Sequence, residues 1–112
     1  MLPRQHRLTR ERDIRHLLRG GRVARGRVLQ LRSRYCGGGT LRFTVVVSTR
    51  VSKKAVIRNR LRRQVRALLQ HRLPRLPRGY DFLISILARN PLPTYDDFRR
   101  DLNHFFSADS KT

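Results

Sequence analysis

The sequence predicts a single α+β domain, a small α/β sandwich in which helices cover one face of one sheet. A chain of 112 residues with 38% hydrophobic content is long enough to bury one core. Apolar residues recur at every second position in some segments and at helical spacing in others, so both strands and helices are expected. Two strand-like segments flank a basic helical segment with no other strand between them, which allows a βαβ crossover. The predicted order is therefore helix, two or three strands, basic helix, strand and helix.

The first element is a helix that follows a basic, proline-containing arm. The arm spans residues 1–7, and the helix spans residues 8–18. Thr9 is the expected N-cap, because its hydroxyl can accept a hydrogen bond from the first turn. Gly20 and Gly21 are expected to end the helix, since glycine commonly follows a helix C-terminus.

Two strands are predicted next, at residues 28–35 and 41–48. In each segment, inward apolar or small side chains alternate with mostly polar or basic ones, as in a strand with one buried face. The loop at residues 36–40 contains three consecutive glycines, so we expect it to join the two strands as a hairpin.

A long basic helix is predicted after the second strand. A loop at residues 49–54 leads into it, with Ser52 as the expected N-cap. The segment 50–69 is rich in Arg and Lys and contains no acid. Its apolar residues share one stripe at a period of 3.6, and they are Ile57, Leu61, Val65, Leu68 and Leu69. The opposite face carries Asn59, Arg62, Arg63 and Arg66, with Arg58 and Arg60 at its flanks. Solvated helices usually interleave acids with bases, so this acid-free face indicates a polyanionic partner.

A strand, a turn and a helix complete the chain. Residues 80–88 are hydrophobic on both faces of a strand, which predicts a central position in the sheet. Thr94 is the expected cap of the last helix, with Asp96 and Asp97 in its first turn. Residues 107–112 are expected to form a disordered tail.

The composition indicates nucleic acid as the partner. Twenty-seven Lys and Arg against seven Asp and Glu give a formal net charge of +20. Nucleic acid is the first candidate for such a field, and an anionic membrane surface is the second. The longest apolar run is strand-length and no secretory signal opens the chain, so we expect no membrane association and a cytoplasmic protein. The single cysteine, Cys36, excludes an intramolecular disulfide and a cysteine-based zinc site.

No self-sufficient active site is predicted. Asp96 and Asp97 are adjacent in a first helical turn, where capping is the expected role. The histidines are scattered, and the triple glycine lacks the Lys-Ser/Thr of a phosphate-binding loop. The protein is therefore expected to act by binding, and to have no catalytic residue, metal site or small-molecule substrate of its own.

The residue types favour folded RNA over a DNA sequence. An Arg-rich helix suits phosphate groups and overall shape better than base edges. An open sheet face is expected to accept a single strand, and it carries Gln30, Arg32, Arg42 and Thr44, with Tyr35 near its edge.

The basic helix also carries a resemblance to a known family. The segment Arg58-Asn59-Arg60-Leu61-Arg62-Arg63 follows Lys53-Lys54-Ala55-Val56 and a Val-rich strand, and it resembles the RNR signature of the bacterial ribonuclease P protein subunit. The resemblance implies the order αβββαβα with a left-handed βαβ crossover, over one RNA-binding domain at residues 1–112. It also implies a protein that assists ribonuclease P RNA, a catalytic RNA, in removing the 5′ leader from precursor tRNA. The reaction uses Mg²⁺, which the RNA mainly holds.

The resemblance assigns residues to two kinds of RNA contact. The catalytic RNA is expected to meet Arg58, Asn59, Arg60, Arg62, Arg63 and Arg66. The loop before the helix is expected to contribute Arg50, Lys53 and Lys54. A cleft between the first helix and the sheet is expected to hold the single-stranded leader and to include Ile14, Leu18, Gln30, Arg32 and Tyr35. Family members often have aromatic residues at the positions of Ile14, Leu18 and Gln30, so backbone charge is expected to outweigh base stacking here.

Other functions stay open from the residues alone. A structural RNA-binding protein of ribosomal type shares this composition. An independent metal nuclease is disfavoured, because the basic region holds no carboxylate cluster. A DNA-compacting protein is disfavoured by the alternating strands, which indicate a packed core.

Overall fold

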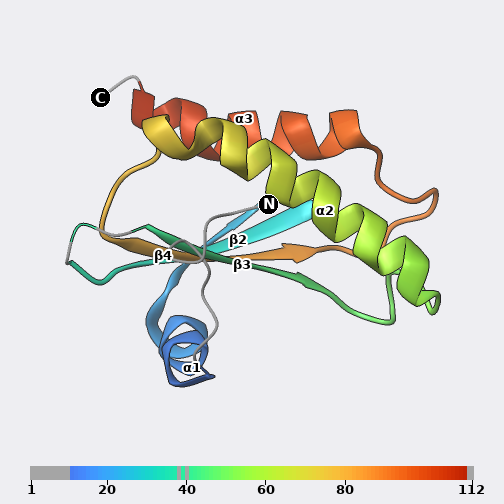
Figure 1. The fold of residues 1–112 in the computed structure, drawn as a ribbon, viewed down its shortest axis with the longest axis horizontal. Helices are drawn as coiled ribbons and strands as arrows, with labels where there is room; N and C mark the ends of the chain where they lie inside the picture. The colour runs from blue at the N-terminus through green and yellow to red at the C-terminus, as the bar shows by residue number, and fades with distance from the viewer. Residues whose placement is uncertain (1–10, 38, 40, 111–112) are drawn as a thin grey trace.

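The computed structural model describes residues 11–37, 39 and 41–110, and its elements follow the order αβββαβα (Figure 1). The helices are α1 (Glu11–Gly20), α2 (Ala55–Arg72) and α3 (Tyr95–Ser110), and the short 3₁₀ helix η2 (Leu73–Arg75) follows α2. The strands are β1 (Arg22–Arg25), β2 (Leu29–Tyr35), β3 (Arg42–Val47) and β4 (Tyr80–Ile86). The predicted arm at residues 1–7 and the predicted start of the first helix lie outside the described residues.

The four strands form one mixed sheet in the order β1-β2-β4-β3. β4 runs antiparallel to β2 and parallel to β3. The predicted central position of the last strand is confirmed, whereas the predicted hairpin between β2 and β3 is wrong. Five of the seven residues of β4 are buried, namely Asp81, Phe82, Leu83, Ile84 and Ile86. In this position β4 is covered by α1 on one face and by α2 and α3 on the other, so both faces of this hydrophobic strand are buried.

Helices cover both faces of the sheet, so the prediction of helices on one face is wrong (Figure 1). α2 and α3 lie on one face, where Phe43, Phe82 and Ile84 belong to the main core. α1 lies on the other face, where Leu17 packs on Leu83. Leu83 is a large apolar residue on that side of the central strand, and α1 removes it from water.

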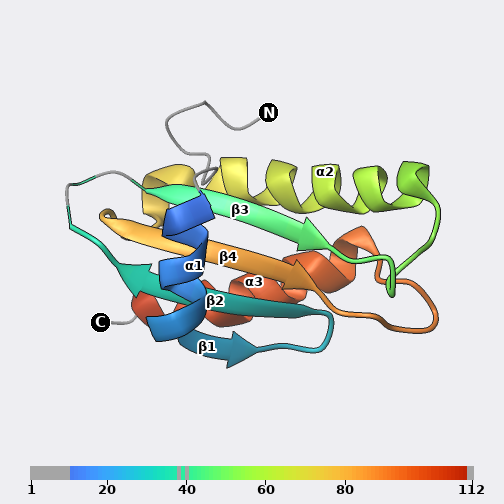
Figure 2. The ribbon, with the colours of Figure 1, turned by 90° about the horizontal axis from the view of Figure 1, so that it is seen from below.

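The connection from β3 through α2 to β4 is left-handed, as the family resemblance implies. Figure 2 views the sheet from the α1 side, with β3 and β4 both running to the right and α2 behind the sheet. The chain returns behind the sheet and enters β4 below β3. This is the opposite hand to most parallel crossovers.

The ends of α1 and α3 agree with the sequence-based expectation. The N–H of Gly21 donates to the carbonyl oxygen of Leu17 at 3.0 Å and closes α1. At the start of α3, the N–H of Asp97 donates to Oγ1 of Thr94 at 3.2 Å, and the N–H of Thr94 donates to Oδ2 of Asp97 at 2.9 Å. This reciprocal pair confirms the predicted cap.

Two predicted boundaries need correction. Lys54, not Ser52, is the N-cap of α2, and it offers no side-chain cap. Ser52 Oγ instead accepts a hydrogen bond from the N–H of Lys54 at 3.2 Å, within the preceding loop. The tail predicted at 107–112 is helical through Ser110, while residues 111–112 lie outside the described residues.

A buried carboxylate fastens the β1–β2 turn to α3. Asp101 is only 6% exposed, and it accepts hydrogen bonds from the backbone N–H groups of Arg27 (3.2 Å), Val28 (2.8 Å) and Leu29 (2.9 Å). A Cβ at Gly26 would overlap the same carboxylate, so the turn approaches α3 as closely as glycine permits. These charge-assisted hydrogen bonds compensate for the desolvation of the carboxylate.

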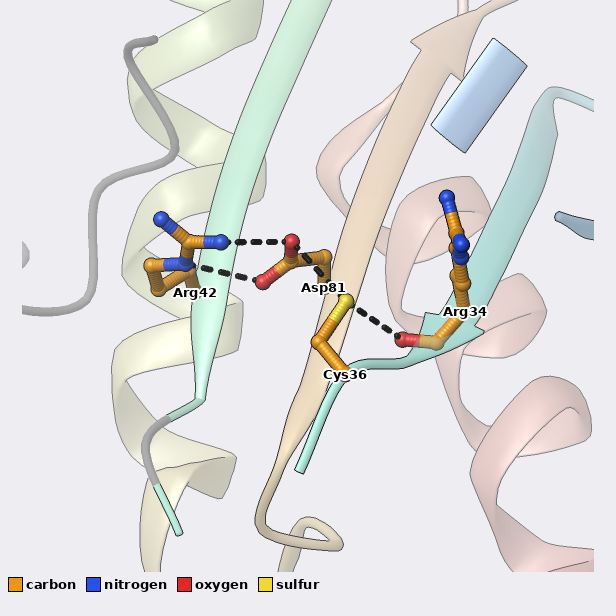
Figure 3. Close-up of polar contacts among 4 residues, drawn as sticks. All are labelled: Arg34, Cys36, Arg42 and Asp81. Atoms are coloured by element: carbon orange, nitrogen blue, oxygen red, sulfur yellow. Dashed lines mark hydrogen bonds and ion pairs between the residues drawn. The ribbon is translucent and has the colours of Figure 1, made fainter. Parts of the chain in front are cut away.

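A second buried carboxylate joins three segments at the other end of the sheet (Figure 3). Asp81 on β4 is 3% exposed and accepts hydrogen bonds from Nε (2.9 Å) and Nη2 (2.7 Å) of Arg42 on β3. The Cys36 thiol, which follows β2, donates to Oδ2 of Asp81 at 3.3 Å. Partial desolvation of the sulfur, and then the hydrogen bond to Asp81, raise the pKa of the Cys36 thiol. The cysteine is therefore a neutral thiol at pH 7 and not an activated nucleophile.

We expect Asp101→Ala to lower the free energy of unfolding by about 2–5 kcal/mol, because three backbone N–H groups lose their charged acceptor. Urea unfolding followed by circular dichroism measures the change. Asp96→Ala is the matched control in the same helix. The ion pair of Asp96 with Arg99 is exposed, so its loss should cost less than about 1 kcal/mol. Equal losses in the two variants would contradict the fastening role of Asp101.

Alkylation of Cys36 by iodoacetamide should require a higher pH in the folded protein than in the unfolded protein. Only the thiolate reacts, and a raised pKa moves the appearance of the thiolate to higher pH. Rates measured against pH, with and without denaturant, give the two profiles. If the folded protein instead reacted at lower pH than the unfolded protein, the arginines near Cys36 would lower the pKa of its thiol more than burial and Asp81 raise it.

Candidate RNA-binding surface

Helix α2 separates an apolar face from a basic face, as the sequence predicts. Its buried residues are Leu61, Val65, Leu68 and Leu69, and Ile57 packs at the edge of the core. The outward face exposes Asn59, Arg60, Arg63 and Arg66, while Arg58 and Arg62 are half-buried. No acid lies in the first turn of α2. The positive end of the helix dipole and the positive guanidinium groups therefore act together there. Both favour an anion at this end of the helix.

Two guanidinium groups of the basic face are held in place by the protein itself. Nη1 of Arg58 donates to the carbonyl oxygen of Ser52 at 2.9 Å, which ties the first turn of α2 to the preceding loop. Nη1 of Arg62 donates to Oδ1 of Asn59, one turn earlier, at 2.7 Å. Because these planar donors are oriented before a ligand arrives, less side-chain entropy is lost when they bind phosphate.

The loop before α2 is ordered by its own hydrogen bonds. Val51 is buried, and its N–H donates to the carbonyl oxygen of Ser48 at 3.1 Å. The hydroxyl groups of Ser48 and Ser52 accept from the backbone N–H groups of Arg50 (3.3 Å) and Lys54 (3.2 Å). The exposed cations of the loop are Arg50, Lys53 and Lys54. They extend the basic face beyond the first turn of the helix.

Positive charge continues to the C-terminal end of α2. Arg72 donates through Nη2 to Oδ1 of Asn103 on α3. Burial first, and then the neighbouring charges of Arg75 and Arg99, lower the pKa of Arg72. Guanidinium groups from α2, η2 and α3 thus repel one another here, and a bound anion would relieve that repulsion.

On the α1 face, cross-strand neighbours form rows over β2, β4 and β3. The rows are Arg34–Asp81–Arg42, Arg32–Leu83–Thr44 and Gln30–Ser85–Val46. The Asp81 ion pair occupies the first row, and Leu17 of α1 covers Leu83 in the second. The third row is more open, since Val46 is 43% exposed and Gln30 and Ser85 are half-buried.

This third row extends at both ends into basic residues. Arg25 of β1 pairs with Gln30 and is exposed. At the other end, β3 continues from Val46 into the loop that carries the cations before α2. We call Arg25, Gln30, Ser85 and Val46 the open strip.

The structure distributes the predicted cleft residues differently. Gln30 lies in the open strip. Ile14 is half-buried and packs against Leu17 and Leu83 in the contact between α1 and the sheet. Leu18 is 49% exposed, and Nη1 of Arg32 donates to its carbonyl oxygen at 3.1 Å, which fastens α1 to β2.

Tyr35 does not lie on this face, so its placement in the cleft is wrong. Side chains alternate along β2, and Tyr35 shares a side with Leu31 and Ser33. Its ring meets that of Tyr80 edge-on, with centroids 5.2 Å apart. Tyr80 packs against the core under α2 and α3, on the sheet face opposite α1.

Three residues of the open strip were missed by the sequence-based assignment. Val46 is on the expected side of its strand, but its apolar character gave no signal of RNA binding. Arg25 and Ser85 join Gln30 only through the pairing of β2 with β1 and with β4. No local pattern encodes that pairing.

The described part of the chain holds no cluster of three or more His, Cys, Asp or Glu side chains that could bind a metal ion. Among the same residues, no helix is both long and apolar enough to span a bilayer.

A family model and a known relative each match this chain over nearly its whole length. The family model described as Ribonuclease P matches residues 2–108. A ribonuclease P protein component from Pseudanabaena sp. is 34% identical over 108 residues, which cover 96% of this chain and 93% of that protein. Another from Synechocystis sp. is 44% identical over 66 residues, covering 59% of this chain and 53% of that protein.

A solved structure has the same fold. The RNase P protein from Thermotoga maritima superposes with a TM-score of 0.78 at 23% identity, covering 91% of this chain and 96% of that one. Fold, family model and relatives all agree with the RNR interpretation of the segment Arg58–Arg63. The chain belongs to the ribonuclease P protein component family, and is thus the protein subunit of a ribonucleoprotein whose RNA is catalytic.

Proposed function

We propose that the chain supplies positive charge in a fixed geometry to both the catalytic RNA and the 5′ leader of precursor tRNA. In this way it assists the Mg²⁺-dependent removal of the leader in the cytoplasm. The catalytic RNA binds the outward face of α2 and the loop before it, through Arg50, Lys53, Lys54, Arg58, Asn59, Arg60, Arg62, Arg63 and Arg66. The proposal is carried by one observation: α2 presents an acid-free row of guanidinium groups, two of them already oriented, in a chain of this family.

The physical task of this surface is to let two polyanions approach each other. A catalytic RNA and its RNA substrate repel through their phosphates, and each guanidinium that replaces condensed counterions lowers that repulsion. A guanidinium group can also donate two parallel hydrogen bonds to two oxygens of one phosphate, which fixes the geometry of the RNA backbone. No side chain of the protein needs to take part in bond breaking.

The leader binds across the open strip, with Leu18 and Arg32 beside it. Gln30 and Ser85 offer hydrogen-bonding groups, Val46 offers an apolar contact, and Arg25 offers a cation. The strip contains no aromatic ring for base stacking. Its contacts therefore favour the leader backbone, with weak preference among bases.

In this proposal the RNA holds the Mg²⁺. The described residues offer no carboxylate or histidine cluster for the ion. Among the described residues, the buried carboxylates Asp81 and Asp101 already have partners, since Asp81 binds Arg42 and Asp101 binds backbone N–H groups. Phosphate oxygens and water are the hard ligands that Mg²⁺ prefers, and the RNA supplies the phosphates.

Adding the protein to ribonuclease P RNA and precursor tRNA at low Mg²⁺ should restore leader removal, which a structural protein of ribosomal type would not do. The slope of log affinity for the RNA against log salt should be on the order of −4 to −6. Arg63→Ala should weaken assembly and make that slope shallower by roughly 0.7 to 1, because one phosphate contact is lost. Arg100→Ala is the matched control, since Arg100 is exposed on α3 and lies outside the proposed surface.

Three results would contradict the proposal. One is leader removal by the purified protein without RNA. Another is a salt slope near zero. The third is an equal loss of assembly in the Arg63 and Arg100 variants.

Photocrosslinkers placed at positions 18, 30 and 46 should react with the leader in the assembled particle, whereas one at position 63 should react with the catalytic RNA. Gel mapping of the crosslinked nucleotides distinguishes the two RNAs. Position 100 provides the background reaction. If positions 30 and 46 crosslinked only to the catalytic RNA, the assignment of the leader to the open strip would be wrong.

A further inference from the structure

The face of the sheet opposite α1 contains a hollow of about 820 Å³ beside the end of α3. It is lined by residues of β1, β2, β4 and α3, together with Gly20 at the end of α1 and Pro77 before β4. The lining residues that matter here are Arg22, Ser33, Tyr35, Tyr80, Phe82 and Phe106. A volume of this size accommodates one or two nucleotides. The sheet separates the hollow from the open strip.

Tyr35 is the exposed end of a series of aromatic rings that runs into the core. It is 66% exposed and meets Tyr80 edge-on, with centroids 5.2 Å apart. Tyr80 stacks on Phe82 at 5.7 Å, and Phe82 meets Phe106 edge-on at 5.5 Å. The exposed ring is therefore backed by fixed neighbours and offers an aromatic face to a planar ligand.

The turn before β4 keeps Tyr35 in this position. Gly79 has a φ of +82°, and a Cβ there would lie 2.9 Å from the Tyr35 ring. The N–H groups of Cys36 and Gly37 both donate to the carbonyl oxygen of Gly79, at 2.7 and 3.1 Å. Backbone hydrogen bonds thus fix the end of β2 against this turn, and the glycine leaves room for the ring.

The strand register brings a cation to the same side as the rings. Arg22 of β1 pairs with Ser33 of β2, which pairs with Phe82 of β4, so the three side chains share the face of the hollow. Arg25, three residues later on β1, lies on the opposite face with Gln30. Arg22 is exposed, and among the described residues that line the hollow none is acidic.

We propose that this hollow is a second RNA site, which takes one or two unpaired nucleotides with a base stacked on Tyr35 and a phosphate on Arg22. An aromatic ring beside a cation is the combination that binds single-stranded nucleic acid with little sequence preference. The hydroxyl groups of Ser33, Tyr35 and Tyr80 can donate or accept hydrogen bonds at base edges. A paired duplex keeps its bases stacked inside, so a single strand fits the hollow and a duplex does not. The inference rests on the proposed RNA-binding function and adds a site to it.

The test uses the full-length protein and a 5′-phosphorylated RNA pentamer, followed by NMR. The ring signals of Tyr35 and Tyr80 should shift in a saturable manner. Tyr35→Ala should weaken binding at this site on the order of tenfold, as read from the Tyr80 ring, and Tyr35→Phe should retain it because the ring remains. Arg22→Ala should weaken it less and make its salt dependence shallower by roughly 0.7.

Matched control variants, together with the signals of α2 and its loop, distinguish failure of the second site from failure of the proposed function. Tyr95→Ala and Arg100→Ala remove an exposed tyrosine and an exposed arginine elsewhere, and they should leave the Tyr35 and Tyr80 shifts unchanged. Shifts confined to α2 and its loop would overturn the second site while the proposed function stands. No shift in either region would overturn both. Equal weakening by Tyr35→Ala and Tyr95→Ala would also overturn the stacking assignment.

Discussion

The position of strand β4 determines the arrangement of the whole molecule. It lies between β2 and β3 and is largely buried, so each of its faces needs a cover. Phe82 and Ile84 require α2 and α3 on one side, and Leu83 requires α1 on the other. Its polar residues on the α1 side, Asp81 and Ser85, become the centre of the Arg42 ion pair and part of the open strip. One hydrophobic strand thereby sets both the core and the candidate leader surface.

Several of the few acidic residues of this chain stabilise the fold, and none of these neutralises the positive charge on the basic face of α2. Asp81 and Asp101 are buried and satisfied by an arginine and by backbone N–H groups. Asp97 caps α3, and Asp96 pairs with Arg99 one turn later. The net charge of +20 destabilises the compact state through repulsion between like charges. A polyanion bound to the basic surface should therefore also stabilise the fold.

Order in the protein prepares the candidate surfaces for RNA. The hydrogen bonds of Arg58 and Arg62 orient guanidinium groups on α2, and the backbone bonds around Gly79 hold Tyr35 over the hollow. Fixed donors and rings lose little entropy on binding. The two surfaces differ in chemistry, since the open strip offers polar groups without aromatic rings and the hollow offers aromatic rings with Arg22 and Arg34.

The sequence by itself determined the elements whose signals are local. The stripe from Ile57 to Leu69 has helical periodicity, the strands ending at Tyr35 and Val47 alternate, and Thr94 with Asp97 forms a cap within four residues. The RNR segment identified the family for the same reason, because it is a short contiguous string. The third strand before the basic helix was allowed for but not assigned to residues, since the four residues of β1, Arg-Val-Ala-Arg, carry too short a pattern.

Only the tertiary structure decided which strands pair and what each sheet face carries. A glycine-rich loop after Tyr35 suggests a hairpin, yet burial of both faces of β4 outweighs that local preference. Alternation alone puts Tyr35 on the side of Leu31, but the register with Tyr80 was needed to show that this side is opposite α1. Pairing between distant segments depends on the total apolar surface buried, which no single stretch of sequence specifies.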